Sequence, residues 1–238
     1  MLIVDDARIL LRMLRGHPTT GSHQENLAAF YGPQAASYDS FRERLLHGRA
    51  QMLDLLAPAP GSRLCEMGCG TGRNLEYLGA ATEQLAAVEL VDLCKPLLEI
   101  AKRRTAHLDN VCVIEGDATT YRPSEQYDAI YFAYALTMIP DWKAAIDNAL
   151  EVLKPGGRLG VVDFFISAAL PAGGRIRHSR LSRLFWRNWF RHDGVHLSPD
   201  HIDYLRERMT ERHLSELRGP VPYLPLAAPY YIFIGDRD

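Results

Sequence analysis

Short apolar runs alternate with longer amphipathic segments through the middle of the chain. Runs of strand length cover residues 62–66, 85–91, 110–115, 127–133 and 157–164. Apolar residues at helical spacing lie between them, in residues 72–78, 93–104 and 141–153. Because strands that alternate with helices at this spacing pair in parallel, the pattern predicts an α/β fold built from βαβ units.

Both ends of the chain depart from this alternation. Residues 1–50 are helix-like with breaks at Gly16-His17-Pro18 and Gly32-Pro33, and we interpret them as an N-terminal helical lid. Residues 51–238 form the main domain. Within it, residues 165 to about 217 are expected to be a helical insertion, in which Ser198 caps a helix with Pro199 at its first position that runs through Met209. A last apolar strand is expected at residues 230–234.

The composition is that of an ordinary globular chain. Its 238 residues are 47% hydrophobic and 24% charged, and the net charge of -2 provides no overall field to attract nucleic acid. Asp5 and Asp6 stand where a signal peptide is basic, and the apolar runs are shorter than a membrane span needs, so a cytoplasmic protein is expected. The spacing of the four cysteines predicts neither disulfides nor a bound metal.

A glycine-rich turn follows the first predicted strand. Gly68-x-Gly70-x-Gly72 has the spacing GxGxG, which differs from the GxGxxG of dinucleotide-binding turns. Glu66 precedes the first glycine, at the end of the strand. A carboxylate there repels a pyrophosphate and attracts a cation. The turn therefore predicts a site for a positively charged ligand.

Two further acids lie at the ends of the next two strands. Asp92 ends the second strand, where carboxylates of such folds bind ribose hydroxyls. Asp117 ends the third strand and is placed to accept a hydrogen bond from an adenine amino group. For each acid taken alone, a helix N-cap or a turn residue is the favoured interpretation. Together they predict a ligand at the carboxyl edge of the sheet.

This set of residues, with Gly116-Asp117-Ala118 and the segment at 153–158, resembles the class I S-adenosylmethionine-dependent methyltransferases over residues 25–165. The resemblance implies a Rossmann-like, mostly parallel seven-stranded sheet with its last strand antiparallel. S-adenosylmethionine would lie across the strand ends, with Glu66 facing its ammonium indirectly, and S-adenosylhomocysteine would be the product. The cofactor residues it implies are Tyr31, Tyr38, Arg49, Glu66, Gly68, Cys69, Gly70, Asn74, Asp92, Leu93, Asp117, Ala118, Ala133 and Tyr134.

Residues 175–191 hold six arginines and no acid. On a helical wheel the arginines from Arg180 onward share one face, while Leu181 and Phe185 lie on another, which is typical of an interfacial helix on anionic lipid. The expected membrane contacts are Arg180, Arg183, Trp186, Arg187, Trp189 and Arg191. The helix could instead cover a core with its arginines solvated. Nucleic acid is disfavoured, because the stripe is short and the chain slightly acidic.

A second resemblance concerns the acceptor. The segments 45–49, 90–94, 193–199, 222–225 and 229–233 resemble the betaine-lipid N-methyltransferases. These enzymes trimethylate the amine of diacylglyceryl-homoserine to form diacylglyceryl-trimethylhomoserine. The resemblance implies a lipid amine substrate, peripheral association with the inner membrane face, and a partner enzyme that makes the homoserine lipid.

An amine acceptor must lose a proton, and its methylated product is a fixed cation. Candidate proton acceptors are His47, Asp163 and His196. Candidate aromatic contacts for the acceptor are Trp142, Tyr223, Tyr230 and Tyr231. Each could instead be structural, and core packing is favoured for the last two. Two rival functions stay open: a soluble small-molecule or quinone methyltransferase, and a module that binds the cofactor without catalysis.

Overall fold

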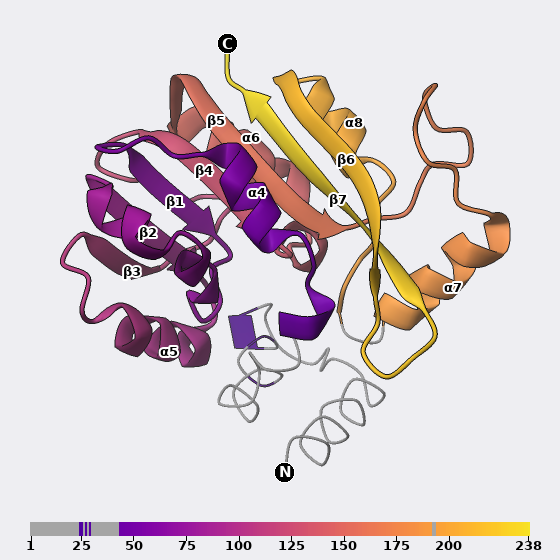
Figure 1. Ribbon diagram of the computed structural model, residues 1–238, viewed down its shortest axis with the longest axis horizontal. Coiled ribbons are helices and arrows are strands. Elements are labelled where there is room, and N and C mark those ends of the chain that lie inside the picture. Colours follow the sequence, from indigo (N-terminus) through magenta and orange to yellow (C-terminus); the bar gives the residue numbers. More distant parts are fainter. Residues whose placement is uncertain (1–23, 26, 28, 30–42, 192–193) are drawn as a thin grey trace.

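The computed structural model describes residues 24, 25, 27, 29, 43–191 and 194–238. Its centre is a seven-stranded sheet in the order β3-β2-β1-β4-β5-β7-β6 (Figure 1). The strands are β1 (Arg63–Met67), β2 (Ala87–Asp92), β3 (Val111–Glu115), β4 (Tyr127–Ala133), β5 (Leu153–Phe164), β6 (Thr210–Pro220) and β7 (Ala227–Asp236). The first five pair in parallel, and β7 is antiparallel to both of its neighbours. The expected α/β sheet with an antiparallel last strand is confirmed.

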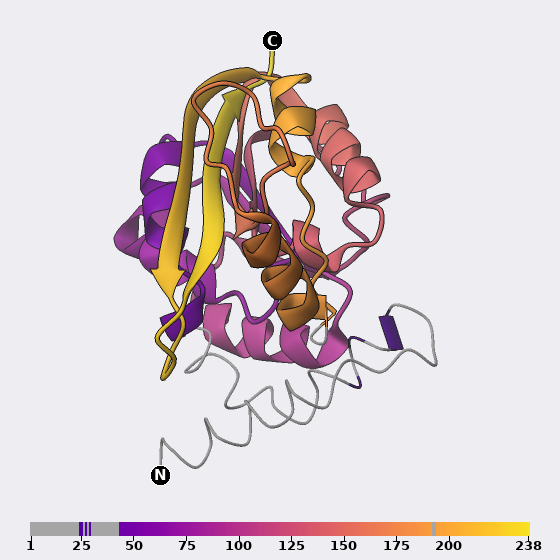
Figure 2. The same cartoon turned by 90° about the vertical axis from the view of Figure 1, so that its right-hand side faces the viewer.

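Helices cover both faces of the sheet, as Figure 2 shows for α4 and α6 on opposite sides. The helical elements are α4 (Arg49–Leu56), η2 (Arg73–Tyr77), η3 (Gly79–Gln84), α5 (Lys95–Thr105), η4 (Leu136–Met138), α6 (Trp142–Val152), α7 (Arg180–Arg191) and α8 (His201–Arg206). Met52 of α4 packs in one buried cluster with Val162 and Ile232, whereas Ile146 of α6 packs in another with Val161 and Phe233. Successive strand residues point to opposite faces, so β5 and β7 supply both clusters.

The helix expected after the glycine turn is a short 3-10 helix, η2. Gly72 and Gly79 bound it, and both have positive φ, 67° and 52°, which ends regular α-helix. Strand β5 begins at Leu153, four residues before the expected start, and so includes the Lys-Pro-Gly-Gly segment.

The expected helical insertion at residues 165 to about 217 is wrong at both ends: residues 165–179 contain no helix, and the helical part ends with α8. Residues 210–220 form β6, a polar edge strand that pairs with β7 along its whole length. Its exposed side is polar, so no local apolar alternation marks it as a strand, although its partner β7 follows directly after the short turn at 221–226. The expected start of the preceding helix is also wrong: α8 begins at His201 after Asp200, because the Ser198 hydroxyl accepts the Asp200 N–H at 3.1 Å and closes a turn.

Within the described residues, the structure has no helix that is both long enough and apolar enough to cross a bilayer.

Candidate cofactor and acceptor site

A cavity of about 330 Å³ opens at the carboxyl ends of the parallel strands. Its wall comes from the glycine turn after β1, from the ends of β2 and β3, and from the loop after β4. This is the edge at which ligands bind in open α/β sheets. Its volume suits a small cofactor.

The glycine turn lies tightly against the loop that follows β4. Gly68 has a φ of 79°, and a Cβ added there would lie 2.5 Å from the Cβ of Ala135. The N–H groups of Gly68 and Cys69 both donate to the Val91 carbonyl, at 2.8 and 3.1 Å. Only glycine fits this close approach. The turn is thereby held against the end of β2.

Asp92 joins the glycine turn to the end of β2. Its Oδ2 accepts the N–H of Gly70 at 2.8 Å, and its Oδ1 accepts the N–H of Cys94 at 2.7 Å. Burial raises its pKa, while these N–H donors act against that rise. Each carboxylate oxygen has a second lone pair, and Asp92 lines the cavity. Asp92 can therefore hold the turn and still accept a hydrogen bond from a hydroxyl of a bound ligand.

Asp117 is fixed in the same manner at the end of β3. Its Oδ1 accepts the N–H and the hydroxyl of Thr119, at 2.8 and 2.7 Å. Asn148 donates to the neighbouring Ala118 carbonyl at 2.8 Å. These contacts orient Asp117 and Ala118, which both line the cavity.

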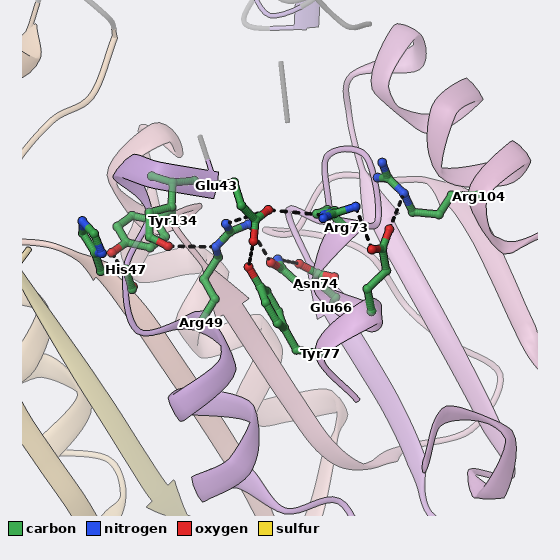
Figure 3. A network of polar contacts seen from close by, with 11 residues as sticks. Glu43, His47, Arg49, Glu66, Arg73, Asn74, Tyr77, Arg104 and Tyr134 are labelled. Atoms are coloured by element: carbon green, nitrogen blue, oxygen red, sulfur yellow. Dashed lines mark hydrogen bonds and ion pairs between the residues drawn. The ribbon is translucent and has the colours of Figure 1, made fainter. Parts of the chain in front are cut away.

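Glu66 contacts Asn74, as Figure 3 shows, and only Asn74 of the two lines the cavity. Its carboxylate accepts from the Asn74 amide at 2.6 Å and from the Tyr131 hydroxyl at 2.7 Å. Burial raises the pKa of Glu66 to about 7 in spite of these donors. Asn74 lines the cavity and Glu66 does not, so the effect of Glu66 on a ligand is indirect.

Arg49 supplies a buried cation to the same wall. Its Nη1 donates to Asn74 Oδ1 at 3.1 Å, and its Nε donates to the Leu46 carbonyl at 3.0 Å. The remaining nitrogen, Nη2, lies 3.5 Å from the Glu43 carboxylate and is buried without a hydrogen bond to any described residue (Figure 3). A buried donor without a partner requires one from elsewhere.

This donor set fits S-adenosylmethionine. Arg49 and Asn74 lie together on the wall and suit the carboxylate of an amino acid, while Asp92 and Asp117 suit hydroxyl and amino donors of a nucleoside. The structure brings these four residues to one cavity together with the other described residues of the predicted set except Glu66: Gly68, Cys69, Gly70, Leu93, Ala118, Ala133 and Tyr134. Tyr31 and Tyr38 lie outside the described residues.

Sequence reasoning missed the loop before α6. Met138, Ile139, Pro140 and Asp141 all line the cavity. The available signal was Asp141 directly before an amphipathic run, and its side chain does cap α6 by accepting the Ala144 N–H at 3.1 Å. A cap fixes where the helix begins, but it does not reveal that the preceding loop turns toward a ligand.

Residues 38–215, more than half of the chain, match a family described as a methyltransferase domain. The chain belongs to this methyltransferase family. It is 28% identical over 144 residues to a demethylmenaquinone methyltransferase of Clavibacter sepedonicus, and 29% identical over 147 residues to that of Renibacterium salmoninarum. The matches cover 58% and 59% of this chain and the same shares of the relatives, so the chain spans less than two thirds of their length.

Solved methyltransferases share the fold. The N-methyltransferase NodS of Bradyrhizobium japonicum, in complex with S-adenosylhomocysteine, has a TM-score of 0.68 at 20% identity, covering 89% of this chain and 98% of that one. Geranyl diphosphate C-methyltransferase of Streptomyces coelicolor has a TM-score of 0.65 at 16% identity, covering 93% and 100%. The protein is an S-adenosylmethionine-dependent methyltransferase, with S-adenosylhomocysteine as its product.

The acceptor side of the methyltransferase begins at Tyr134. Its φ of 56° is in the left-handed region, which costs about 1–3 kcal/mol for a residue of this kind. The hydroxyl donates to the His47 carbonyl at 2.7 Å, and the ring packs edge-on against Phe164 at 4.6 Å. Phe164 in turn packs against Phe190 of α7 at 4.4 Å. A continuous line of aromatic rings thus runs from the cofactor cavity to α7.

The three candidate proton acceptors have different surroundings. His47 Nε2 lies 2.9 Å from the Pro220 carbonyl, which can only accept, so the neutral ring takes the tautomer with the proton on Nε2 and a lone pair on Nδ1. Asp163 is fully buried and accepts from the N–H and hydroxyl of Thr137, at 3.1 and 2.7 Å, and burial raises its pKa to about 7. It therefore positions the loop after β4. The His196 side chain is exposed, and the backbone N–H of His196 donates to the Thr137 carbonyl at 2.7 Å.

Only some of the aromatic residues expected to contact the acceptor lie near the acceptor side of the cavity. Trp142 packs against His201 and Tyr204, with ring centroids 4.5 and 5.2 Å apart, and it does not line the cavity. Tyr231 is fully buried in the core. Trp142 and Tyr231 therefore have the structural packing role that was the alternative for the candidate rings. Tyr230 lies 6.1 Å from the His47 ring, and Tyr223 is exposed in the β6–β7 turn.

Helix α7 is oriented differently from the expectation. Trp186 is buried, as is Phe190, so Trp186 faces the core and not a membrane. Arg183 shares that side, is half-buried, and its Nε is buried without a hydrogen bond to a described residue. It is therefore not part of an exposed basic face. Arg175, before the helix, is buried in ion pairs with Glu216 and Asp203.

Proposed function

We propose that this methyltransferase methylates the amine of a membrane-lipid headgroup, with diacylglyceryl-homoserine as the acceptor and diacylglyceryl-trimethylhomoserine as the product. The observation that carries the proposal is the line of rings from Tyr134 through Phe164 to Phe190. It supports an acceptor that approaches along an apolar, aromatic wall. The betaine-lipid resemblance supports an amine as the acceptor group.

The reaction needs positioning more than covalent catalysis. S-adenosylmethionine supplies a methyl group on a sulfonium. With S-adenosylmethionine bound, the neutral amine nitrogen would take up the methyl group, the N–C bond forming as the C–S bond breaks and S-adenosylhomocysteine being released. Asp92, Asp117 and Arg49 hold the cofactor, while the rings beside Tyr134 exclude water from the acceptor.

Each neutral amine must be produced by loss of a proton to a base. We assign this role to His47, because its Nε2–H is held by the Pro220 carbonyl and its Nδ1 remains able to accept. The third methyl transfer creates a quaternary ammonium that has no proton to lose. The rings of Tyr134, Phe164 and Tyr230 supply aromatic faces that stabilise such a cation.

A second candidate is methylation of a quinone. The curated relatives named above are demethylmenaquinone methyltransferases, and their names favour this candidate over the amine. An isoprenoid quinone is also carried by a membrane, so an apolar acceptor wall fits both candidates. The chemistry of the accepting group separates them.

Transfer of labelled methyl groups from S-adenosylmethionine decides between the candidates. Vesicles would carry diacylglyceryl-homoserine, phosphatidylethanolamine or demethylmenaquinol, and a fourth sample would contain a soluble amine without lipid. We expect label in the homoserine lipid alone. Label in demethylmenaquinol alone establishes the quinone candidate, and label only in the soluble amine rejects a lipid acceptor. If the homoserine lipid is the substrate, an enzyme that transfers a homoserine group to a diacylglycerol must supply it.

A further inference from the structure

Helix α7 carries apolar side chains on two opposite faces. Trp186 and Phe190 are buried in the core. Leu181, Leu184 and Phe185 are spaced i, i+3, i+4, and they are 79%, 60% and 41% exposed. A helix that only covers a core presents polar residues outward. Phe185 also packs against the rings of Trp186 and Trp189, with centroids 4.9 and 5.7 Å apart, but the stripe as a whole faces outward.

Within the described part of the chain, exposed large apolar side chains occur only after β5 in the sequence. Among the described residues they are Leu170, Leu181, Leu184, Phe185, Tyr223 and Leu224. All of them follow β5 in the sequence, and none lies in the half of the domain that holds the glycine turn. Apolar exposure along one face of a helix, as on α7, is typical of a binding surface.

A basic stripe borders the outward apolar stripe. Arg180, Arg187 and Arg191 are exposed and lie on one flank of the helix, seven and four residues apart. The helix has no Asp or Glu to neutralise them. Apolar side chains next to uncompensated arginines complement a surface that offers hydrocarbon beneath negative charge, which is an anionic bilayer.

We propose that the outward face of α7 docks the enzyme on an anionic lipid bilayer. Leu181, Leu184 and Phe185 enter the headgroup region, and the flanking arginines contact lipid phosphates. This inference rests on the proposed function, because docking is useful to the enzyme if its acceptor is a membrane lipid. The opposite face of the same helix reaches Tyr134 through Phe190 and Phe164, so docking holds the acceptor side of the cofactor cavity near the membrane (Figure 1).

Co-sedimentation with vesicles tests the docking without any need for turnover. The probes are vesicles of phosphatidylcholine alone and of phosphatidylcholine with phosphatidylglycerol. The variants are Leu184→Ser in the apolar stripe and Arg187→Gln in the basic stripe. Arg103→Gln, an exposed charge on α5, is the matched control, and calorimetry with S-adenosylhomocysteine verifies that each variant is folded.

We expect wild-type protein to bind the anionic vesicles and to bind neutral ones much more weakly. Arg187→Gln should weaken binding about 5-fold, and Leu184→Ser about 10-fold or more, while Arg103→Gln stays within 2-fold. Equal binding by wild type and both α7 variants overturns the proposal. So does a self-associating wild type that does not bind vesicles and becomes monomeric with Leu184→Ser, because the stripe is then a contact between copies.

Vesicle binding without methylation of any lipid amine leaves the docking intact and rejects the proposed function. Methylation of a detergent-dispersed homoserine lipid by an enzyme that does not bind vesicles supports the proposed function and rejects the docking.

Discussion

The cofactor half and the acceptor half of the domain are built in different ways. In the cofactor half, Asp92 and Asp117 stand at strand ends and are held by backbone groups within a few residues or on the neighbouring turn. In the acceptor half, His47, Tyr134, Phe190 and Pro220 come from segments far apart in the sequence and meet through packing. A site made of local motifs tolerates change elsewhere in the chain. A site made by packing depends on the core that assembles it.

The largest expected effect lies within α7 and separates its two apolar faces. Trp186→Ala should lower the free energy of unfolding by about 3–5 kcal/mol, because it leaves a cavity in the core. Leu184→Ala removes an exposed side chain and should change it by less than about 0.5 kcal/mol. Urea denaturation of both variants measures the difference. Equal losses would show that the helix is not oriented as described here.

The next largest effect concerns His47, and it tests whether this residue accepts the proton of the amine. His47→Gln keeps a donor for the Pro220 carbonyl but removes the lone pair of Nδ1, so kcat should fall about 100-fold. The affinity for S-adenosylhomocysteine should stay within about 2-fold, because the His47 ring does not line the cofactor cavity.

His107→Gln, at an exposed histidine, is the control for the His47 variant and should have no effect on kcat. Single-turnover kinetics as a function of pH would detect the change. An unaltered rate with His47→Gln removes His47 as the proton acceptor.

The smallest effect concerns the buried acid of the cofactor half. Burial raises the pKa of Glu66 from 4.5 to about 7, so the folded state favours its neutral form. The stability that neutral Glu66 contributes to the folded state is therefore lost as the pH rises from about 4.5 to 7. Relative to wild type, Glu66→Gln should gain roughly 2–3 kcal/mol of stability between pH 5 and pH 8.

Asp163, whose pKa burial also raises to about 7, remains in the Glu66→Gln variant, as does His201, whose pKa burial lowers to about 3. The comparison therefore isolates Glu66. Glu125→Gln, at a side chain that is 71% exposed, is the control. Thermal denaturation at a series of pH values measures the difference, and parallel curves for wild type and Glu66→Gln would mean that Glu66 titrates normally.

Local sequence was enough to predict most of the cofactor half. Glycines at positions 68, 70 and 72 indicated a turn that needs positive φ, and acids at consecutive strand ends indicated a shared edge. Neither inference needed knowledge of distant contacts, because turn geometry and the parallel alternation of strands and helices are local properties. The loop at 138–141 was missed, since its role depends on the direction in which it turns.

By itself the sequence determined the α/β fold, the cofactor edge of the sheet and the presence of a basic, aromatic helix near residue 185. Tertiary structure alone decided that β6 is an edge strand, that Asp163 supports a loop, and which face of α7 is buried. The physical reason is the same for each. Helical periodicity shows that a helix has two apolar faces, but only the shape of the remaining core selects the face with Trp186 for burial and leaves the one with Leu184 exposed.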